Sequence, residues 1–104
     1  MGRLHGGSYW VLCALADGDA HGYLIAQRIQ VLAEDEVRVG TGTLYAAIER
    51  LLADGFIRLV KEEVFEGRNR RTYRITGTGR KAAIEETERR RTAIVRASTQ
   101  LGLA

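Results

Sequence analysis

The sequence contains no proline, one cysteine and two histidines among its 104 residues. A single cysteine excludes an intramolecular disulfide and a cysteine-rich zinc site. Cys13 lies in the apolar run 10–15, a setting that favours a buried structural thiol over a reactive one. Neither His5 nor His21 has a serine or cysteine in a recognisable nucleophile context, and no residues show metal-ligand spacing. The sequence therefore predicts no catalytic centre and no cofactor or metal site.

The chain also lacks a long hydrophobic segment. No run approaches the roughly 20 apolar residues that span a bilayer, and the first residues lack the pattern of a signal peptide. A glycine-rich segment at 40–43 has no lysine where a phosphate-binding loop would place one, which favours a helix-capping turn. We expect a soluble cytoplasmic protein that contacts no membrane and is not an enzyme.

Hydrophobic residues make up 45% of the chain, enough for the core of one domain. The net charge of +3 is unevenly distributed. Residues 38–81 contain ten Lys and Arg against five Asp and Glu, whereas residues 1–37 contain two against five. This concentration of positive charge indicates a surface that meets a polyanion such as nucleic acid, although a solvated basic face has the same composition.

Apolar periodicity and turn residues predict the order helix, helix, helix, strand, strand, helix, an α+β fold that is mainly α. The first two helices are expected over 8–17 and 20–33, with Ser8 and Asp19 as N-caps. The third helix follows the turn 40–43, whose hydroxyls can cap it. This helix is expected to end at Gly55, and the extended segment 37–39 before it can form a short strand. Two strands are expected over 56–61 and 72–76. The last helix is expected to begin at 76–78 and to run to about Gln100.

The third helix is the clearest of these elements. Its core-facing stripe recurs at helical spacing and consists of Leu44, Ile48, Leu51 and Leu52. A similar stripe in the second helix consists of Ile25, Ile29 and Leu32. Its opposite face offers mostly small or polar residues, namely Thr43, Ala46, Ala47, Arg50 and Ala53, with Tyr45 at the edge.

A helix, a turn and a second helix can seat the latter in the major groove of DNA, whose width of about 12 Å admits one helix. Small residues on the exposed face let the third helix approach the bases closely. Thr43, Tyr45 and Arg50 can donate hydrogen bonds to bases or phosphates, and the helix N-terminus near Thr41 favours an anionic oxygen.

An arginine-rich hairpin tip follows at 62–71. Arginine side chains can grip phosphates through their planar forks, but they can also simply keep a solvated hairpin from pairing edge to edge. Directly after a helix pair of this kind, DNA binding is the favoured interpretation. Most affinity is expected from phosphate contacts of Arg38, Arg50, Lys61, Arg68, Arg70 and Arg71.

The last helix has few apolar residues for its length. About 23 residues span roughly 35 Å, which overshoots a domain of this size. Glu85/Arg89 and Glu86/Arg90 are expected to pair along it. Its apolar residues are expected to need a partner surface; they are Ala83, Ile84, Ile94, Val95 and Leu101.

Three linked motifs resemble the PadR family of transcriptional regulators. They are HGYLI at 21–25, GTLYAAI at 42–48 with GFI at 55–57, and GRNRRTYRIT at 67–76, and the resemblance covers about residues 8–81. It departs from the family at Ala46, which stands where a proline usually follows the tyrosine of the third helix. This departure bears on local rigidity and base readout rather than on the fold.

The resemblance implies a winged helix-turn-helix protein that binds a palindromic operator as a dimer, usually as a repressor. It places Thr43, Tyr45 and Ala46 against DNA and the tip of the wing at Gly67, Arg68, Asn69 and Arg70. Tyr23 either touches a phosphate or closes the helix pair as a core residue, and the sequence leaves both interpretations open. The alternative function is a protein-interaction module whose basic wing grips an acidic partner.

Members of the family pair through their first and last helices. Residues 1–76 would then form the DNA-binding domain and 77–104 the dimerisation helix. Some relatives bind aromatic or hydrophobic effectors at the dimer interface, although a lone tryptophan such as Trp10 is more often a core or interface residue. The expected interface residues are Trp10, Leu12, Ile84, Ile94, Val95 and Leu101.

Overall fold

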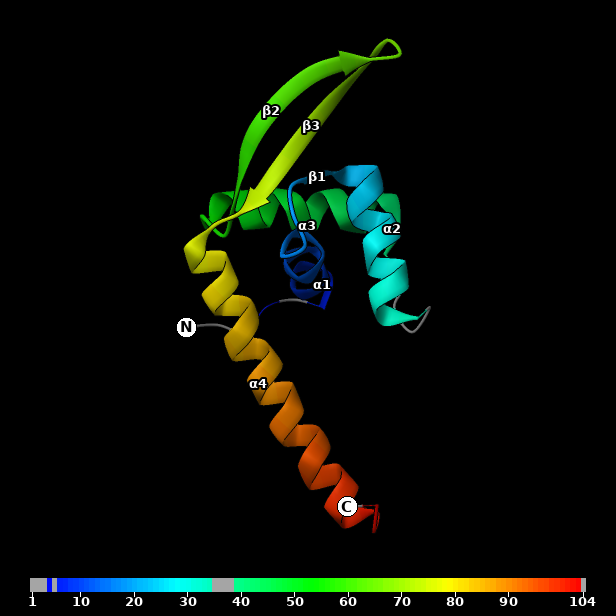
Figure 1. Ribbon diagram of the computed structural model, residues 1–104, viewed down its shortest axis with the longest axis vertical. Coiled ribbons are helices and arrows are strands. Elements are labelled where there is room, and N and C mark those ends of the chain that lie inside the picture. The colour runs from blue at the N-terminus through cyan, green and yellow to red at the C-terminus, as the bar shows by residue number, and fades with distance from the viewer. Residues whose placement is uncertain (1–3, 5, 35–38, 104) are drawn as a thin grey trace.

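A computed structural model of the chain describes residues 4, 6–34 and 39–103. Three helices form the body, a long hairpin projects from it, and a fourth helix leaves in the opposite direction (Figure 1). The elements are α1 Gly6–Leu15, β1 Ala20–His21, α2 Gly22–Ala33, α3 Thr41–Ala53, β2 Ile57–Phe65, β3 Arg68–Ile75 and α4 Gly77–Gln100.

The core lies where α1, α2 and α3 pack together. It confirms most of the predicted stripes, because Ile25 and Ile29 of α2 are buried, as are three of the four apolar residues of the α3 stripe. Leu32 does not belong to it, since this side chain is 51% exposed. The residues of α1 and α3 that are 0% exposed are Val11, Leu12, Ala14, Ile48 and Leu51.

Two predicted N-caps are wrong. Helix α1 begins at Gly6, so that Ser8 is a buried residue inside it. Before α2, residues Ala20 and His21 pair with β3, and the cap passes to His21, whose Nδ1 accepts a hydrogen bond from the Leu24 amide at 3.4 Å. Asp19 instead accepts two hydrogen bonds from the Arg74 guanidinium, at 3.0 and 2.7 Å.

The segment before α3 also differs from the prediction. Gly40 is the N-cap of α3 and offers no side chain for a capping hydrogen bond, so the helix begins without help from the threonine hydroxyls. Of the proposed strand at 37–39, residues 37 and 38 lie outside the described residues, and Val39 is not in a strand. The predicted end is confirmed, because Gly55 follows the C-cap with a φ of 74°.

The strands β2 and β3 are longer than the sequence predicted. They form an antiparallel wing joined by Glu66 and Gly67, with φ of 51° and 78°. Two successive residues at positive φ form the tight turn that matches the right-handed twist of a hairpin. The eight residues of β3 span about 26 Å, so the turn stands well away from the helices.

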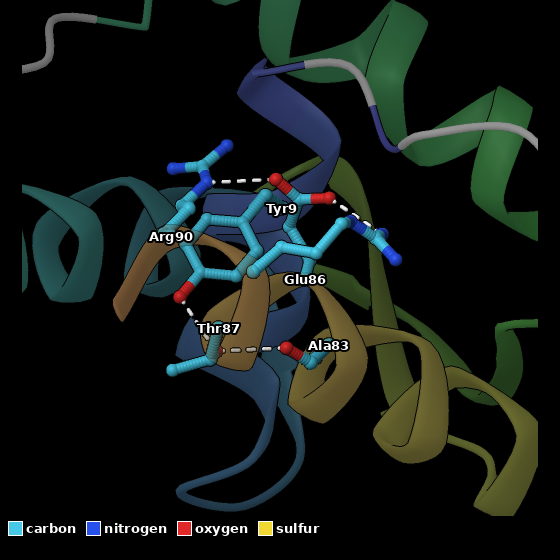
Figure 2. A network of polar contacts seen from close by, with 6 residues as sticks. Tyr9, Ala83, Glu86, Thr87 and Arg90 are labelled. Atoms are coloured by element: carbon cyan, nitrogen blue, oxygen red, sulfur yellow. Dashed lines mark hydrogen bonds and ion pairs between the residues drawn. The ribbon is translucent and has the colours of Figure 1, made fainter. Parts of the chain in front are cut away.

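Helix α4 has the predicted boundaries and is tied to α1 by a polar network (Figure 2). Tyr9 of α1 makes a hydroxyl contact of 2.7 Å with Thr87, whose own proton is donated to the carbonyl of Ala83 at 2.8 Å, so Tyr9 is the donor. The Arg90 guanidinium stacks 3.9 Å from the centre of the Tyr9 ring. These contacts fix the first half of α4 against α1.

A buried carboxylate completes this network. Glu86 is 0% exposed and accepts hydrogen bonds from Arg89 at 2.8 Å and from Arg90 at 2.9 Å. The predicted Glu86/Arg90 pair is therefore confirmed, whereas Arg89 pairs with Glu86 and not with Glu85. The buried carboxylate needs two cations to compensate for its lost hydration, and exposed Glu85 does not.

Candidate nucleic-acid interface

A cleft of about 700 Å³ lies between the wing, the N-terminus of α2 and one side of α3. Tyr23 lines it from α2, Tyr45 and Glu49 line it from α3, and Arg68 to Arg71 line it from β3. Two of the sequence motifs and the wing arginines, far apart in the chain, are thus brought to one face of the molecule.

The outward ridge of α3 is made of four exposed residues at helical spacing, Gly42, Ala46, Glu49 and Ala53. At 100° per residue these positions lie opposite the buried stripe. Three of the four are Gly or Ala, so the helix backbone can approach a ligand closely. Ala47, which the sequence placed on this exposed face, is only 2% exposed because it packs toward α1.

Thr43 and Tyr45 lie on opposite flanks of this ridge. Thr43 lies beside the start of α1, where its Cγ2 is 3.6 Å from the position of a Cβ on Gly7. Arg50 is on the same flank, with Nη1 3.5 Å from the hydroxyl of Ser8. Tyr45 lies on the wing side and its hydroxyl approaches Gly22. Arg50 is therefore directed toward α1 and away from the cleft, although it still borders the ridge.

The wing carries the predicted basic residues, but several have partners. Arg71 donates to Glu62 at 2.9 Å, which raises the pKa of the guanidinium, and Lys61 lies 3.5 Å from Glu63. Arg70 stacks 3.7 Å from the centre of the Phe65 ring, which leaves its charge uncompensated. Arg68 has no ion-pair partner among the described residues and stands next to the turn.

Two residues at the start of α2 were not anticipated as parts of the site. His21 lines the cleft, and burial, followed by the charge of Arg70, lowers its pKa. The neutral imidazole is the form that can accept the capping hydrogen bond at Nδ1. Gly22 faces Tyr45 so closely that a Cβ there would lie 2.9 Å from the tyrosine hydroxyl. The absence of a side chain at Gly22 thus leaves room for the Tyr45 ring to pack against the start of α2.

The remaining candidate residues have these positions. Tyr23 is 70% exposed at the cleft, so the interpretation of it as a core residue is wrong. Thr41 is the exposed first residue of α3, and Asn69 and Gly67 are exposed on the wing. Arg38 lies outside the described residues.

The expected interface residues on α4 are exposed: Ile84, Ile94, Val95 and Leu101 are 55–72% accessible. Trp10 is half-buried in an edge-on contact with Tyr9, with ring centres 5.1 Å apart. Leu12 is 0% exposed in the core of its own chain, so it has no surface for a partner in this conformation.

Other kinds of site leave no trace in the described part of the chain. No group of three or more His, Cys, Asp or Glu side chains there is placed to hold a metal ion. Within the same residues, no helix combines the length and the apolar character that crossing a membrane requires. Cys13 is half-buried, and burial raises the pKa of its thiol.

A helix pair whose second member presents an outward ridge, flanked by a basic two-stranded hairpin, defines a winged helix-turn-helix protein. Comparison with known proteins gives the family. The family model described as "Transcriptional regulator PadR-like family" matches residues 11–85. The transcriptional regulator Rv3488 of Mycobacterium tuberculosis is 39% identical over 84 residues, which are 81% of this chain and 70% of the relative. The chain belongs to the PadR-like family, whose members are transcriptional regulators and not enzymes.

Solved structures show the same fold. A transcriptional regulator from Clostridium thermocellum superposes with a TM-score of 0.75 at 27% identity, with 88% of this chain and 89% of that chain covered. PadR of Bacillus subtilis, crystallised in complex with operator DNA, superposes with a TM-score of 0.66 at 19% identity, over 75% of this chain and 44% of that chain.

Proposed function

We propose that this PadR-family regulator is a repressor that binds a palindromic DNA operator as a homodimer. The observation that carries the proposal is the shared cleft, which is lined by Tyr45 on the outward side of α3 and by the arginines of β3. The operator complex of Bacillus subtilis PadR, a protein of the same fold, supports DNA as the partner. Such a regulator finds its DNA in the cytoplasm, where we place this chain.

In this proposal the ridge of α3 enters the major groove and the wing follows the adjacent backbone. Gly42 and Ala46 at the ridge let the helix lie deep in the groove, whose width of about 12 Å fits one helix. Arg68 and Arg70 reach phosphates from the wing, and Thr41, Thr43, Tyr23 and Lys61 contact the backbone at the borders of the site. Residues 1–76 are the part that docks on DNA.

Residues 77–104 supply the dimer contact. The face of α4 that packs on α1 carries Ala83, and the same face continues beyond the body as Ile94 and Leu101, 11 and 18 residues further. Ile94 is 65% exposed and Leu101 is 72% exposed, so nothing within the described chain covers this extension. Apolar residues on one stripe of an overhanging helix favour a second copy of the chain as the partner.

A two-fold dimer presents two α3 helices to successive major grooves, about 34 Å apart. Release by an aromatic or hydrophobic effector at the dimer contact would involve Trp10, the only tryptophan of the chain. Quenching of its fluorescence by a candidate effector, together with loss of DNA binding, tests that part of the proposal.

Salt dependence of DNA binding tests the interface. If six phosphates are neutralised per dimer, the plot of log K against log salt concentration should have a slope of about −5. The double variant Arg68→Ala/Arg70→Ala removes four charges per dimer and should bring the slope to about −2. Fluorescence anisotropy with a duplex selected from genomic fragments provides the measurement.

The matched control removes the same charge elsewhere. Lys81→Ala/Arg96→Ala changes two exposed residues on the side of α4 away from the Ala83 stripe, and it should leave the slope unchanged. Equal effects of both double variants would refute the wing as the phosphate contact. Failure of the wild-type chain to bind any duplex, combined with salt-sensitive binding to an acidic protein, would favour the protein-interaction module.

A further inference from the structure

Glu49 is the one charged residue on the outward ridge of α3, the part of the surface proposed to meet DNA. Of the four outward residues of the α3 ridge, the other three are Gly42, Ala46 and Ala53, none of which carries a polar side-chain atom. Glu49 therefore holds the only functional group on the line of the helix that faces directly away from the core. Thr43 and Tyr45 lie on the flanks.

The carboxylate of Glu49 has no hydrogen-bond or ion-pair partner among the described residues, although it faces the cleft that Arg68, Arg70 and Arg71 line. Glu62 and the ring of Phe65 engage Arg71 and Arg70. Its charge contributes to the raised pKa of Tyr73, after burial of that phenol, and it makes no hydrogen bond or ion pair with the described residues of the wing. Glu49 is thus not needed to hold the wing arginines in place.

A free carboxylate in this position opposes binding to the DNA backbone, because phosphate and carboxylate repel each other. The same group becomes favourable only where DNA offers a hydrogen-bond donor that is clear of acceptors on at least one side. In the major groove, the cytosine amino group at N4 meets this condition, because the O6 acceptor of the paired guanine lies on one side of it only, and carboxylates are its usual partners. The adenine amino group lies between two acceptors, N7 of the same base and O4 of the paired thymine, and both repel a carboxylate.

We propose that Glu49 is a specificity residue that accepts a hydrogen bond from the N4 amino group of a cytosine in each half-site. The proposal rests on the proposed DNA-binding function and adds to it the identity of one base pair. Glu49 acts by attraction toward cytosine and by repulsion from every other base at that position, as well as from unspecific DNA.

The test is selection of duplexes from a random library by the wild-type chain, Glu49→Gln and Glu49→Ala. Wild type should enrich a C·G pair at one position per half-site by on the order of tenfold. Glu49→Gln should move the preference at that position to adenine, because an amide pairs with N6 and N7 together. Glu49→Ala should lose the preference at this position alone and bind unspecific DNA a few-fold more tightly.

The control is Glu85→Gln, which makes the same chemical change at an exposed site on α4 and should leave the selected sequence unaltered. Since Glu49 is exposed, its variants should unfold at the temperature of the wild type. A wild type that selects a defined operator, with the same sequence selected by both Glu49 variants, would overturn this assignment and leave the proposed function standing. A wild type that selects no duplex would overturn both.

Discussion

Gly79 offers the sharpest test of how α4 joins the winged domain. It is the third residue of α4, buried against the turn between α3 and β2. A Cβ at this position would overlap the carbonyl oxygen of Phe56, which is backbone and cannot rotate away. That carbonyl also accepts a hydrogen bond from the Thr76 amide at 3.0 Å. The variant Gly79→Ala must therefore displace the start of α4 or the turn.

The magnitude follows from these contacts. Overpacking of this kind costs about 1–3 kcal/mol, and loss of the Thr76 hydrogen bond adds about 1 kcal/mol. The better helix propensity of alanine offsets up to about 1 kcal/mol. The net loss is then about 1–4 kcal/mol, which corresponds to a fall in melting temperature of roughly 5–30 °C for a domain of this size.

Gly77 is the matched control. It lies two residues earlier in the same helix, has open space around the position of its Cβ, and is not at positive φ. Gly77→Ala should keep or slightly raise the melting temperature, because alanine reduces the entropy of the unfolded chain. Thermal unfolding followed by circular dichroism, at one protein concentration, compares the two variants. Equal stability of Gly79→Ala and Gly77→Ala would refute the packing of α4 on the turn.

Three further predictions concern side-chain contacts of α1, α2 and the strand before α2. Gly22→Ala should push the Tyr45 hydroxyl from its place and weaken DNA binding in an anisotropy titration, with an unchanged melting temperature; unaltered affinity would show that Tyr45 does not contact DNA. Tyr9→Phe removes the 2.7 Å bond to Thr87 but keeps the ring, and should cost about 1 kcal/mol, or roughly 4–8 °C; a variant as stable as wild type would contradict this anchoring of α4. Burial lowers the pKa of His21, so the unfolded chain binds more protons than the folded chain; the contribution of His21 to folding stability is therefore full above about pH 6.5 and is lost as the pH falls through the folded pKa. His21→Asn, which keeps a capping side chain, should flatten the dependence of the melting temperature on pH between about pH 7 and 5. A pH dependence equal to that of wild type would exclude His21 as the group that titrates.

Local patterns predicted the elements well. The stripe of Leu44, Ile48 and Leu51 and the boundaries of α4 depend on periodicity and on short-range capping, which the sequence displays directly. The wing was recognised from its strands and its turn. Its length was underestimated because polar residues in an exposed hairpin look like loop residues.

Features that depend on distant partners could not be predicted. The strand β1 exists only because Ala20 and His21 pair with β3, about 50 residues away. Ala47 is buried because α1 crosses α3 beside Gly7, which periodicity within α3 does not reveal. Glu49 was overlooked because an acidic residue opposes a basic site, although its spacing from Ala46 and Ala53 places it on the exposed ridge.

Interference by methylated guanines tests the central claim most directly, because a methyl group on N7 blocks the major groove and leaves the backbone intact. If two α3 ridges enter successive major grooves, methylation should abolish binding in two tracts whose centres are about 10 base pairs apart. Binding that tolerates methylation at every guanine, or that is lost at a single tract only, would contradict the paired α3 helices and the dimer that presents them.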